Sequence, residues 1–188
     1  MEPGSSRKQN LVLVMIGSGL MLIAVAAFFA LLKDQEKPKT VSALAVPVVV
    51  DFSMPDIRLT DLQGQPVAFS DYKGQVILYN AWATWCPPCK EEMPTLEGYY
   101  RAHRQQGFVV IAIEDGQPVA EVAAYVAEMG LTFPVWPDLK WVASETFGIN
   151  NLPTSYVIDR SGVVRLMWRG AISRDALEQY VTPLLKEP

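Results

Sequence analysis

The feature that most constrains the fold is a continuous apolar run that leads straight into a pair of cysteines. The run QVILYNAW, residues 75–82, follows Gly74 and suits a central strand covered on both faces. Cys-Pro-Pro-Cys follows at residues 86–89, and from Cys86 the pattern turns helical to about Gln106. A buried strand, a Cys-x-x-C motif and a helix in this order form a redox signature with a physical basis.

The rest of the chain alternates in the same way between strand-like and helix-like segments. We expect Pro94 to kink or break the helix that holds the cysteines. Strands alternating with helices, then a final hairpin and helix, predict a mixed central sheet with helices on both faces. The expected elements are a leading hairpin at 55–74, strands at 108–113 and 132–138, helices at 118–130 and 141–148, paired strands at 154–168 and an amphipathic helix at 173–185.

An apolar stretch near the N-terminus predicts a membrane anchor. Residues 11–32 contain no charged side chain, and 22 residues make about 33 Å of helix, which matches a bilayer core. A cleavable signal peptide has a shorter apolar region, and the Ala-Leu-Ala at 43–45 lies too far beyond this one to be a good cleavage site. We therefore expect an uncleaved anchor, although the flanking basic residues leave its orientation open.

The sequence divides into four expected parts, and the net charge of the residues after the anchor bears on what the globular domain can bind. An N-terminal tail (1–10) precedes the transmembrane anchor (11–32), a linker (33–46) and a globular domain (47–188). Residues 33–188 hold 14 of the 16 basic and 19 of the 20 acidic side chains, a formal charge of −5. With no basic stripe and no glycine-rich phosphate loop, this composition does not indicate nucleic-acid binding.

The two cysteines admit three interpretations, of which redox chemistry is favoured. A sulfur at Cys86 would sit at a helix N-terminus, which favours the attacking thiolate, and Cys89 lies one turn further on the same face. A structural zinc site needs four ligands, and the chain offers only these two cysteines and His103, an expected surface residue. Cu(I) held by Cys86 and Cys89 stays open as a lesser alternative. A purely structural disulfide would close too short a loop to remove much chain entropy.

These motifs resemble the TlpA/ResA-like membrane-anchored thiol-disulfide oxidoreductases of the thioredoxin superfamily. The resemblance covers about residues 47–188 and rests on four segments in matching order and spacing. They are WATWCPPCKEEMP, the proline at position 94 within its helix, LPTSYVID, and the leading hairpin DLQGQPVAFSDYKG. Peroxidase chemistry, which occurs in related folds, lacks its T-x-x-C context here, and no distant resolving cysteine exists.

The resemblance implies a fold, a location and several residue roles. It implies an α/β thioredoxin-like fold, in which a mixed central sheet has helices on both faces, an N-terminal β-hairpin and a helical insertion. One transmembrane helix would precede this domain. It also implies a single-pass protein of the cell membrane whose catalytic domain is extracytoplasmic. In this family Cys86 would be the nucleophile and Cys89 the resolving thiol, with Pro153 a cis-proline beside the disulfide. Leu152 would meet the substrate through its main chain.

The neighbours of the cysteines suggest how the couple is tuned. Asn80 stands where thioredoxins commonly bury an aspartate, and Glu92, on the cysteine face of the helix, is the natural replacement proton carrier. Glu92 could instead be an acid favoured by the helix dipole. Pro87 withdraws an N–H donor and so favours a reductant, unless it only stiffens the turn. We expect Trp82 in the core and Trp85 at the rim, where it can meet a substrate.

The sequence therefore predicts a membrane-anchored thiol-disulfide oxidoreductase that reduces disulfides of exported proteins in apocytochrome c or copper-site biogenesis. We expect no cofactor beyond the Cys86–Cys89 disulfide, and a membrane dithiol donor that regenerates the reduced form. The alternatives are a Cu(I)-binding assembly factor and a disulfide oxidant.

Overall fold

The structure is a computed structural model that describes residues 46–187. The predicted tail (1–10), the predicted anchor (11–32) and all but the last residue of the predicted linker (33–46) lie outside the described residues. Among the helices found in residues 46–187, none has the length and apolar character needed to cross a bilayer.

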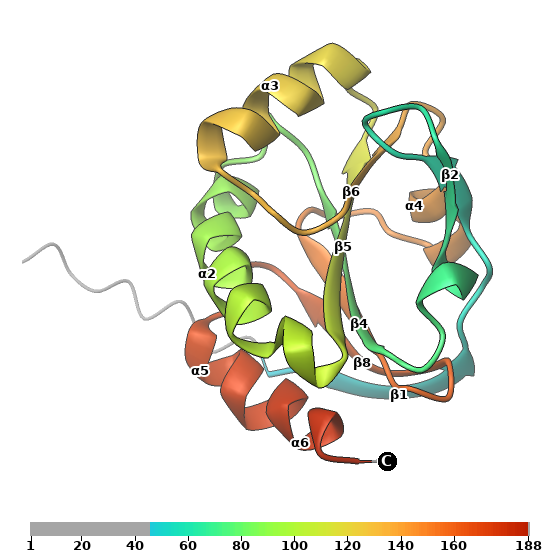
Figure 1. Cartoon of the computed structure of the whole chain (residues 1–188), viewed down its shortest axis with the longest axis vertical. Coiled ribbons are helices and arrows are strands. Elements are labelled where there is room, and N and C mark those ends of the chain that lie inside the picture. Colours follow the sequence, from blue (N-terminus) through green and yellow to red (C-terminus); the bar gives the residue numbers. More distant parts are fainter. Residues whose placement is uncertain (1–45, 188) are drawn as a thin grey trace, which may run out of the picture. The chain divides into compact units, whose positions relative to one another are not determined.

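A six-stranded mixed sheet forms the centre of the described domain (Figure 1). Its strand order is β1-β8-β7-β4-β5-β6, in which β4, β5 and β6 run parallel and the other neighbours pair antiparallel. The side chains of β4 are all buried, as expected for a strand with both faces covered. The strands are β1 (Val48–Ser53), β4 (Val76–Trp82), β5 (Phe108–Asp115), β6 (Val135–Asp138), β7 (Thr154–Ile158) and β8 (Val163–Arg169).

Helices cover both faces of this sheet, as the sequence pattern predicts. In Figure 1, α2, α3, α5 and α6 lie on one side of the strands, and α4 lies on the other with β2. Alternate residues of β4 enter two separate cores, with Leu78 on the α2 side and Tyr79 on the α4 side. The helices are α2 (Pro87–His103), α3 (Val119–Met129), α4 (Val142–Phe147), α5 (Arg174–Ala176) and α6 (Thr182–Leu185), with short 3₁₀ turns η1 (Phe69–Tyr72) and η2 (Arg104–Gln106).

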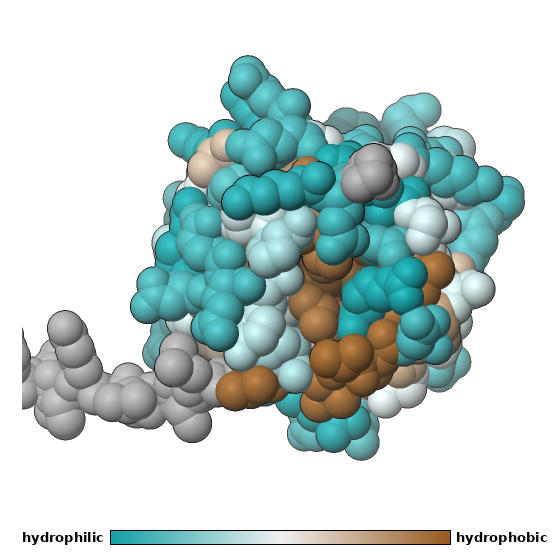
Figure 2. Space-filling view, turned by 90° about the horizontal axis from the view of Figure 1, so that it is seen from below, coloured by the Kyte–Doolittle hydropathy of each residue, from teal (hydrophilic) through white to brown (hydrophobic). Residues whose placement is uncertain are grey.

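The leading hairpin forms as predicted, but a strand precedes it that the sequence pattern did not indicate. β2 (Arg58–Thr60) pairs antiparallel with β3 (Pro66–Ala68) and packs beside the main sheet. β1 is an edge strand paired only with β8, and its exposed apolar side chains include Val48, Val49 and Phe52. Figure 2 views the molecule from below Figure 1 and shows hydrophobic residues gathered on part of the surface seen from that side. Because β1 is exposed on both faces over most of its length, it lacks the alternation that identifies a half-buried strand.

Two helices differ from the sequence prediction. α2 continues through Pro94, so the break, one of the two expected outcomes, is absent, and η2 extends the helical segment to Gln106, its expected end. The predicted C-terminal helix begins at Ser173, whose hydroxyl accepts from the Ala176 N–H as an N-cap should. It is then divided by a π-helical turn, η3 (Leu177–Val181), before α6 begins beside Pro183. Proline lacks the N–H that a continuous α-helix would need at that point.

His103 is not the surface residue that the helix pattern indicates. Its side chain is 12 % exposed, and its ring centroid lies 4.3 Å from that of Tyr99. Nε2 lies 3.7 Å from a carboxylate oxygen of Glu178 on η3. The residue therefore packs between α2 and the C-terminal segment.

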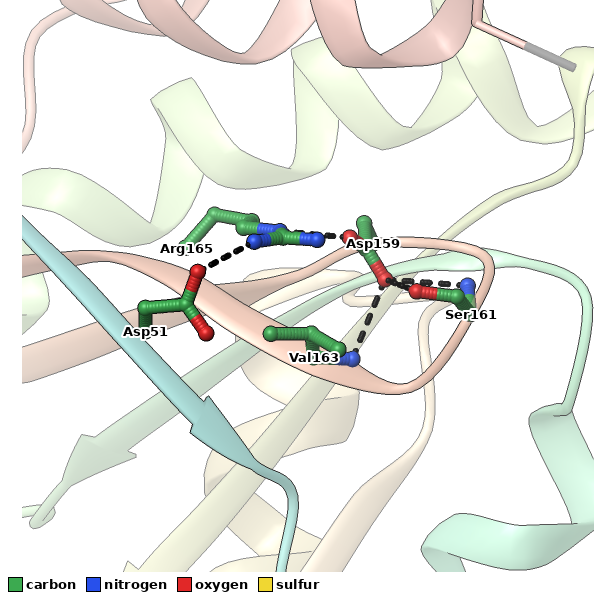
Figure 3. A network of polar contacts seen from close by, with 5 residues as sticks. All are labelled: Asp51, Asp159, Ser161, Val163 and Arg165. Carbon is green, nitrogen blue, oxygen red and sulfur yellow. Dashed lines mark hydrogen bonds and ion pairs between the residues drawn. The ribbon is translucent and has the colours of Figure 1, made fainter.

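A polar network fixes the register of the outer strands (Figure 3). Nε of Arg165 donates to Asp159 and its Nη1 donates to Asp51, each at 2.6 Å, so one side chain of β8 joins β1 to the β7–β8 turn. The other oxygen of Asp159 accepts the N–H groups of Ser161 and Val163. Although burial opposes it, these hydrogen bonds and Arg165 lower the pKa of Asp159.

Arg160 in the same turn joins three backbone segments that are distant in sequence. Its guanidinium donates to the carbonyl oxygens of Gly74, Gln106, Leu185 and Glu187 at 2.9 to 3.1 Å. These carbonyls belong to the segment before β4, the end of η2 and the C-terminus of the chain. Arg160 therefore holds these segments together at the end of the sheet opposite the cysteines.

Candidate active site

The two cysteines lie where β4 ends and α2 begins. Cys86 is the N-cap of α2 and Cys89 lies in its first turn, and their sulfurs form a disulfide with an S–S distance of 2.08 Å. Cys86 is 3 % exposed and Cys89 is completely buried. Of the two cysteines, Cys86 is therefore the more exposed.

Two prolines remove most of the donors that a helix N-terminus would offer to Cys86. Pro87 and Pro88 occupy the first two helical positions and have no N–H. The N–H of Cys89 donates to Sγ of Cys86 at 3.3 Å. Backbone N–H groups are the donors that stabilise a thiolate at this position, so the Cys-Pro-Pro-Cys sequence leaves Cys86 with reduced support.

Glu92 lies one turn after Cys89 and is almost entirely buried, with 2 % of its surface exposed. Oε1 accepts from Nδ2 of Asn80 at 2.8 Å, and Oε2 accepts from the N–H of Ile172 at 2.9 Å. Burial raises the pKa of Glu92 to about 7, against the lowering effect of these two hydrogen bonds. A carboxyl group with this pKa can take up and release a proton near neutral pH.

The Asn80 side chain makes a second hydrogen bond, to a residue on the neighbouring strand β7. Its Nδ2 also donates to Oγ of Ser155 at 2.9 Å, and Ser155 is its direct partner across the β4–β7 ladder. In the described part of the chain, Oδ1 of Asn80 is buried without a hydrogen-bond partner. The amide therefore links Glu92 to Ser155 on β7, and Ser155 lies two residues after Pro153.

Glu114 supports the loop that carries the cysteines. This carboxylate is fully buried at the end of β5 and accepts the N–H groups of Thr84, at 3.4 Å, and Gln117, at 3.0 Å. Burial raises its pKa. Thr84 lies two residues before Cys86, so Glu114 helps to position the start of the motif from the neighbouring strand.

A groove of about 490 Å³ lies beside Cys86. Trp85 and Leu152 line it together with Cys86, and Trp85 is 62 % exposed. The Leu152–Pro153 peptide bond is cis, as the resemblance implied. The remaining lining residues are Pro87, Pro88, Asp115, Trp141, Ile149, Asn150 and Asn151.

The predicted site residues fall into two sets. Trp85, Cys86 and Leu152 meet at the groove, whereas Glu92 is buried, does not line the groove, and contacts Asn80 and Ile172. Trp82 is in the core, as expected, where it packs on Tyr125.

Sequence reasoning missed Asp115, Trp141 and Ser155. Asp115 lies two residues after the predicted strand at 108–113, and this position could have signalled a site, because ligand-binding residues gather at the carboxyl ends of parallel strands. Trp141 and Ser155 carry no such local signal.

The described residues offer few groups to a metal ion. In residues 46–187, no three His, Cys, Asp or Glu side chains are grouped so that they could hold one. After reduction, the two sulfurs of Cys86 and Cys89 could still hold a soft ion such as Cu(I).

Comparison with known proteins agrees with this geometry. Residues 50–167 match the model of the AhpC/TSA family. The thiol-disulfide oxidoreductase ResA of Geobacillus thermodenitrificans is 33 % identical over 134 residues, which cover 71 % of this chain and 77 % of that protein. ResA of Oceanobacillus iheyensis is 33 % identical over 172 residues, which cover 89 % of this chain and 86 % of that protein.

A solved structure extends the likeness to three dimensions. The crystal structure of a thiol:disulfide interchange protein of the thioredoxin family from Chlorobium tepidum superposes with a TM-score of 0.65 at 27 % identity, covering 73 % of this chain and 99 % of that chain. The predicted thioredoxin-like α/β fold is therefore confirmed for the globular part of the chain.

Proposed function

Because this chain belongs to the AhpC/TSA family and is a thiol-disulfide oxidoreductase of the ResA type, we propose that it is a disulfide reductase tethered to the cell membrane. In this proposal residues 11–32 form an uncleaved single-pass anchor, residues 33–46 a linker and residues 47–188 an extracytoplasmic catalytic domain. The 22 uncharged residues of the apolar stretch support the anchor.

The first step is attack by the reduced Cys86 on a substrate disulfide. The Cys86 thiolate forms a new S–S bond to one substrate sulfur, and the substrate S–S bond breaks. The second substrate sulfur leaves as a thiolate and takes a proton from solvent. Trp85 and Leu152 border the groove in which this mixed disulfide would lie.

The second step releases the reduced substrate. The Cys89 thiol gives its proton to the Glu92 carboxylate, and the resulting thiolate attacks Sγ of Cys86. The Cys86–Cys89 disulfide forms, the mixed disulfide breaks, and the substrate sulfur leaves as a thiolate, which takes a proton from solvent. Two electrons have then passed to the substrate, and a membrane dithiol donor returns two electrons to the Cys86–Cys89 disulfide.

The observation that carries the direction of this reaction is the pair of prolines at the head of α2. Oxidising power in such couples comes from stabilising the reduced form, and Pro87 and Pro88 withhold N–H donors from the Cys86 thiolate. The couple should therefore give electrons readily. We propose the haem-site cysteines of apocytochrome c, or cysteines of a copper-site protein, as substrates.

A trapping experiment in the native host tests the function. In a Cys89→Ser variant the second step cannot occur, so substrates should accumulate as mixed disulfides on Cys86 and be identified by mass spectrometry. Cys86→Ser is the matched control, and it should capture nothing. An absence of captured partners under conditions in which the wild type turns over would contradict the mechanism.

Two further measurements separate the alternatives. A reduction potential near the thioredoxin value of about −270 mV supports a reductase, whereas a value near about −120 mV would indicate an oxidant. Copper binding that survives Cys89→Ser, a variant that cannot complete the redox cycle, would favour the Cu(I)-binding assembly factor over the enzyme.

A further inference from the structure

Three parallel strands each place one side chain in the groove beside Cys86. Trp85 follows β4, Asp115 is the last residue of β5, and Trp141 follows β6. The carboxyl ends of neighbouring parallel strands meet at one edge of a sheet, where ligands commonly bind. The groove is therefore built from the same edge as the cysteines, and its composition bears on which substrates reach Cys86.

The two tryptophans leave much of their surface uncovered. Trp85 is 62 % and Trp141 is 52 % exposed. Large aromatic rings exposed beside a nucleophile offer flat faces to a partner, and the face of an indole ring attracts cations.

The backbone holds Trp141 in an unusual conformation. Its φ of 54° lies in the left-handed region, and no other non-glycine residue in the described part of the chain has a positive φ. The indole lies against Gly116, since a Cβ at that position would come within 2.7 Å of Nε1 of Trp141. A strained backbone of this kind persists only where the surroundings determine it and is common at binding sites. The ring is thereby kept beside Asp115.

Asp115 is the only charged side chain among the described residues that line the groove. Its Oδ2 accepts from the hydroxyl of Ser144 at 2.8 Å, while Oδ1 is buried from solvent and has no donor within residues 46–187. Burial, together with the charge of Asp138, raises the pKa of Asp115, with Ser144 opposing. A partly buried carboxylate that lacks a donor would be stabilised by a cation brought into the groove.

We propose that this groove selects disulfides that have a basic residue beside the reacting cysteine. In this arrangement the ammonium or guanidinium group lies against the indole faces of Trp85 and Trp141 and is attracted by Asp115. The inference rests on the proposed reductase function and adds a substrate class to it.

Synthetic peptides with one intramolecular disulfide test this inference. Three peptides are identical except for Lys, Gln or Glu beside one cysteine, and the pre-reduced full-length protein reduces them. For each peptide, the rate constant for reduction by the protein is divided by the rate constant for reduction of the same peptide by dithiothreitol. This ratio corrects for differences in intrinsic reactivity between the peptide disulfides. We expect the Lys peptide to react about 10-fold faster than the Glu peptide on this scale, as one cation–π contact and one partly exposed ion pair would give.

Variants then assign the preference to the groove. Asp115→Asn keeps the shape of the side chain and should reduce the Lys-to-Glu ratio to about 3-fold, and Trp141→Ala should reduce it similarly, whereas Trp141→Phe should retain part of it. Glu91→Gln is the matched control, because it removes the same charge from an exposed position on α2 and should leave the ratio unchanged. Added salt should weaken the preference of the wild type.

The outcomes separate this inference from the proposed function. Rates that do not depend on peptide charge after the dithiothreitol correction would overturn the inference and leave the reductase intact. A ratio that Asp115→Asn and Trp141→Ala leave unchanged would also overturn it. If the reduced protein acted on none of the peptides, the proposed function would fail, and this inference with it.

Discussion

Asn80 and Glu92 are joined by a hydrogen bond of 2.8 Å in the interior of the domain, 12 positions apart in the chain. The amide comes from the central strand and the carboxylate from the helix that carries the cysteines. Ile172, in the loop after β8, donates to the other carboxylate oxygen. The proposed proton carrier is thus held from two sides, and one of its partners, Ile172, is far from the cysteines in sequence.

The pKa of Glu92 makes stability depend on pH. Its folded-state pKa of about 7 lies above the ordinary value of 4.5, so between these values the folded state binds a proton that the unfolded chain releases. The free energy of unfolding should therefore fall as pH rises from 4.5 to 7, by about 3 kcal/mol from this group. Glu92→Gln, which imitates the protonated acid, should lack this component.

Denaturant titrations of the oxidised wild type and of Glu92→Gln at pH 5 and pH 8 measure this effect. The difference between the two proteins isolates Glu92 from other groups with raised pKa values, such as Glu114. Parallel pH dependences of the two proteins would show that Glu92 does not titrate in this range.

Removing the Asn80 amide should raise the pKa of Glu92 further. The hydrogen bond from Nδ2 favours the charged carboxylate, so Asn80→Ala should move the midpoint of the pH effect upward by about one unit. Ser155→Ala removes only the second acceptor of the amide and should cause a smaller upward shift. Wild-type-like midpoints in both variants would mean that the amide does not tune Glu92. The midpoint can be followed by denaturant titration across pH 5 to 9.

Much of the fold could be predicted because its elements follow one-dimensional rules. The buried strand β4, the helix that ends at Gly130 and the leading hairpin all have local signals, namely continuous apolar residues, a left-handed glycine and turn residues. β1 escaped prediction because its pairing with β8 comes from the opposite end of the domain and leaves no pattern in the strand itself.

The site residues also differ in whether local sequence patterns could predict them. Cys86, Cys89 and Glu92 are spaced three residues apart at the start of α2, so helix geometry places them on one face. The contact of Asn80 with Ser155 requires the β4–β7 ladder, and the place of Trp141 in the groove requires the β5–β6 pairing. Tertiary contacts of this kind cannot be read from spacing along the chain.

Arg160 should stabilise the domain through its backbone contacts. Arg160→Ala removes four hydrogen bonds from one guanidinium, and because the side chain is partly exposed we expect a loss of about 2 kcal/mol in the free energy of unfolding. Arg160→Lys keeps the charge but not the planar set of donors and should recover only part of this loss. Chemical denaturation of the oxidised protein provides the measurement. Equal stability of the Lys variant and the wild type would indicate that charge, rather than the hydrogen bonds, is responsible.

Pro87 should hold the reduction potential low by withholding a donor from Cys86. Pro87→Gly and Pro87→Ala both restore an N–H at the first helical position, and each should raise the potential by about 30 mV, which corresponds to about 1.4 kcal/mol for a two-electron couple. Equilibration of each variant with glutathione buffers gives the value. The comparison between Gly and Ala distinguishes the two possible roles of the proline. A donor effect should appear in both variants, whereas stiffening of the turn would be relieved chiefly by glycine, the more flexible residue. A rise confined to Pro87→Gly would therefore refute the donor explanation, and with it the structural argument that this couple is a reductant.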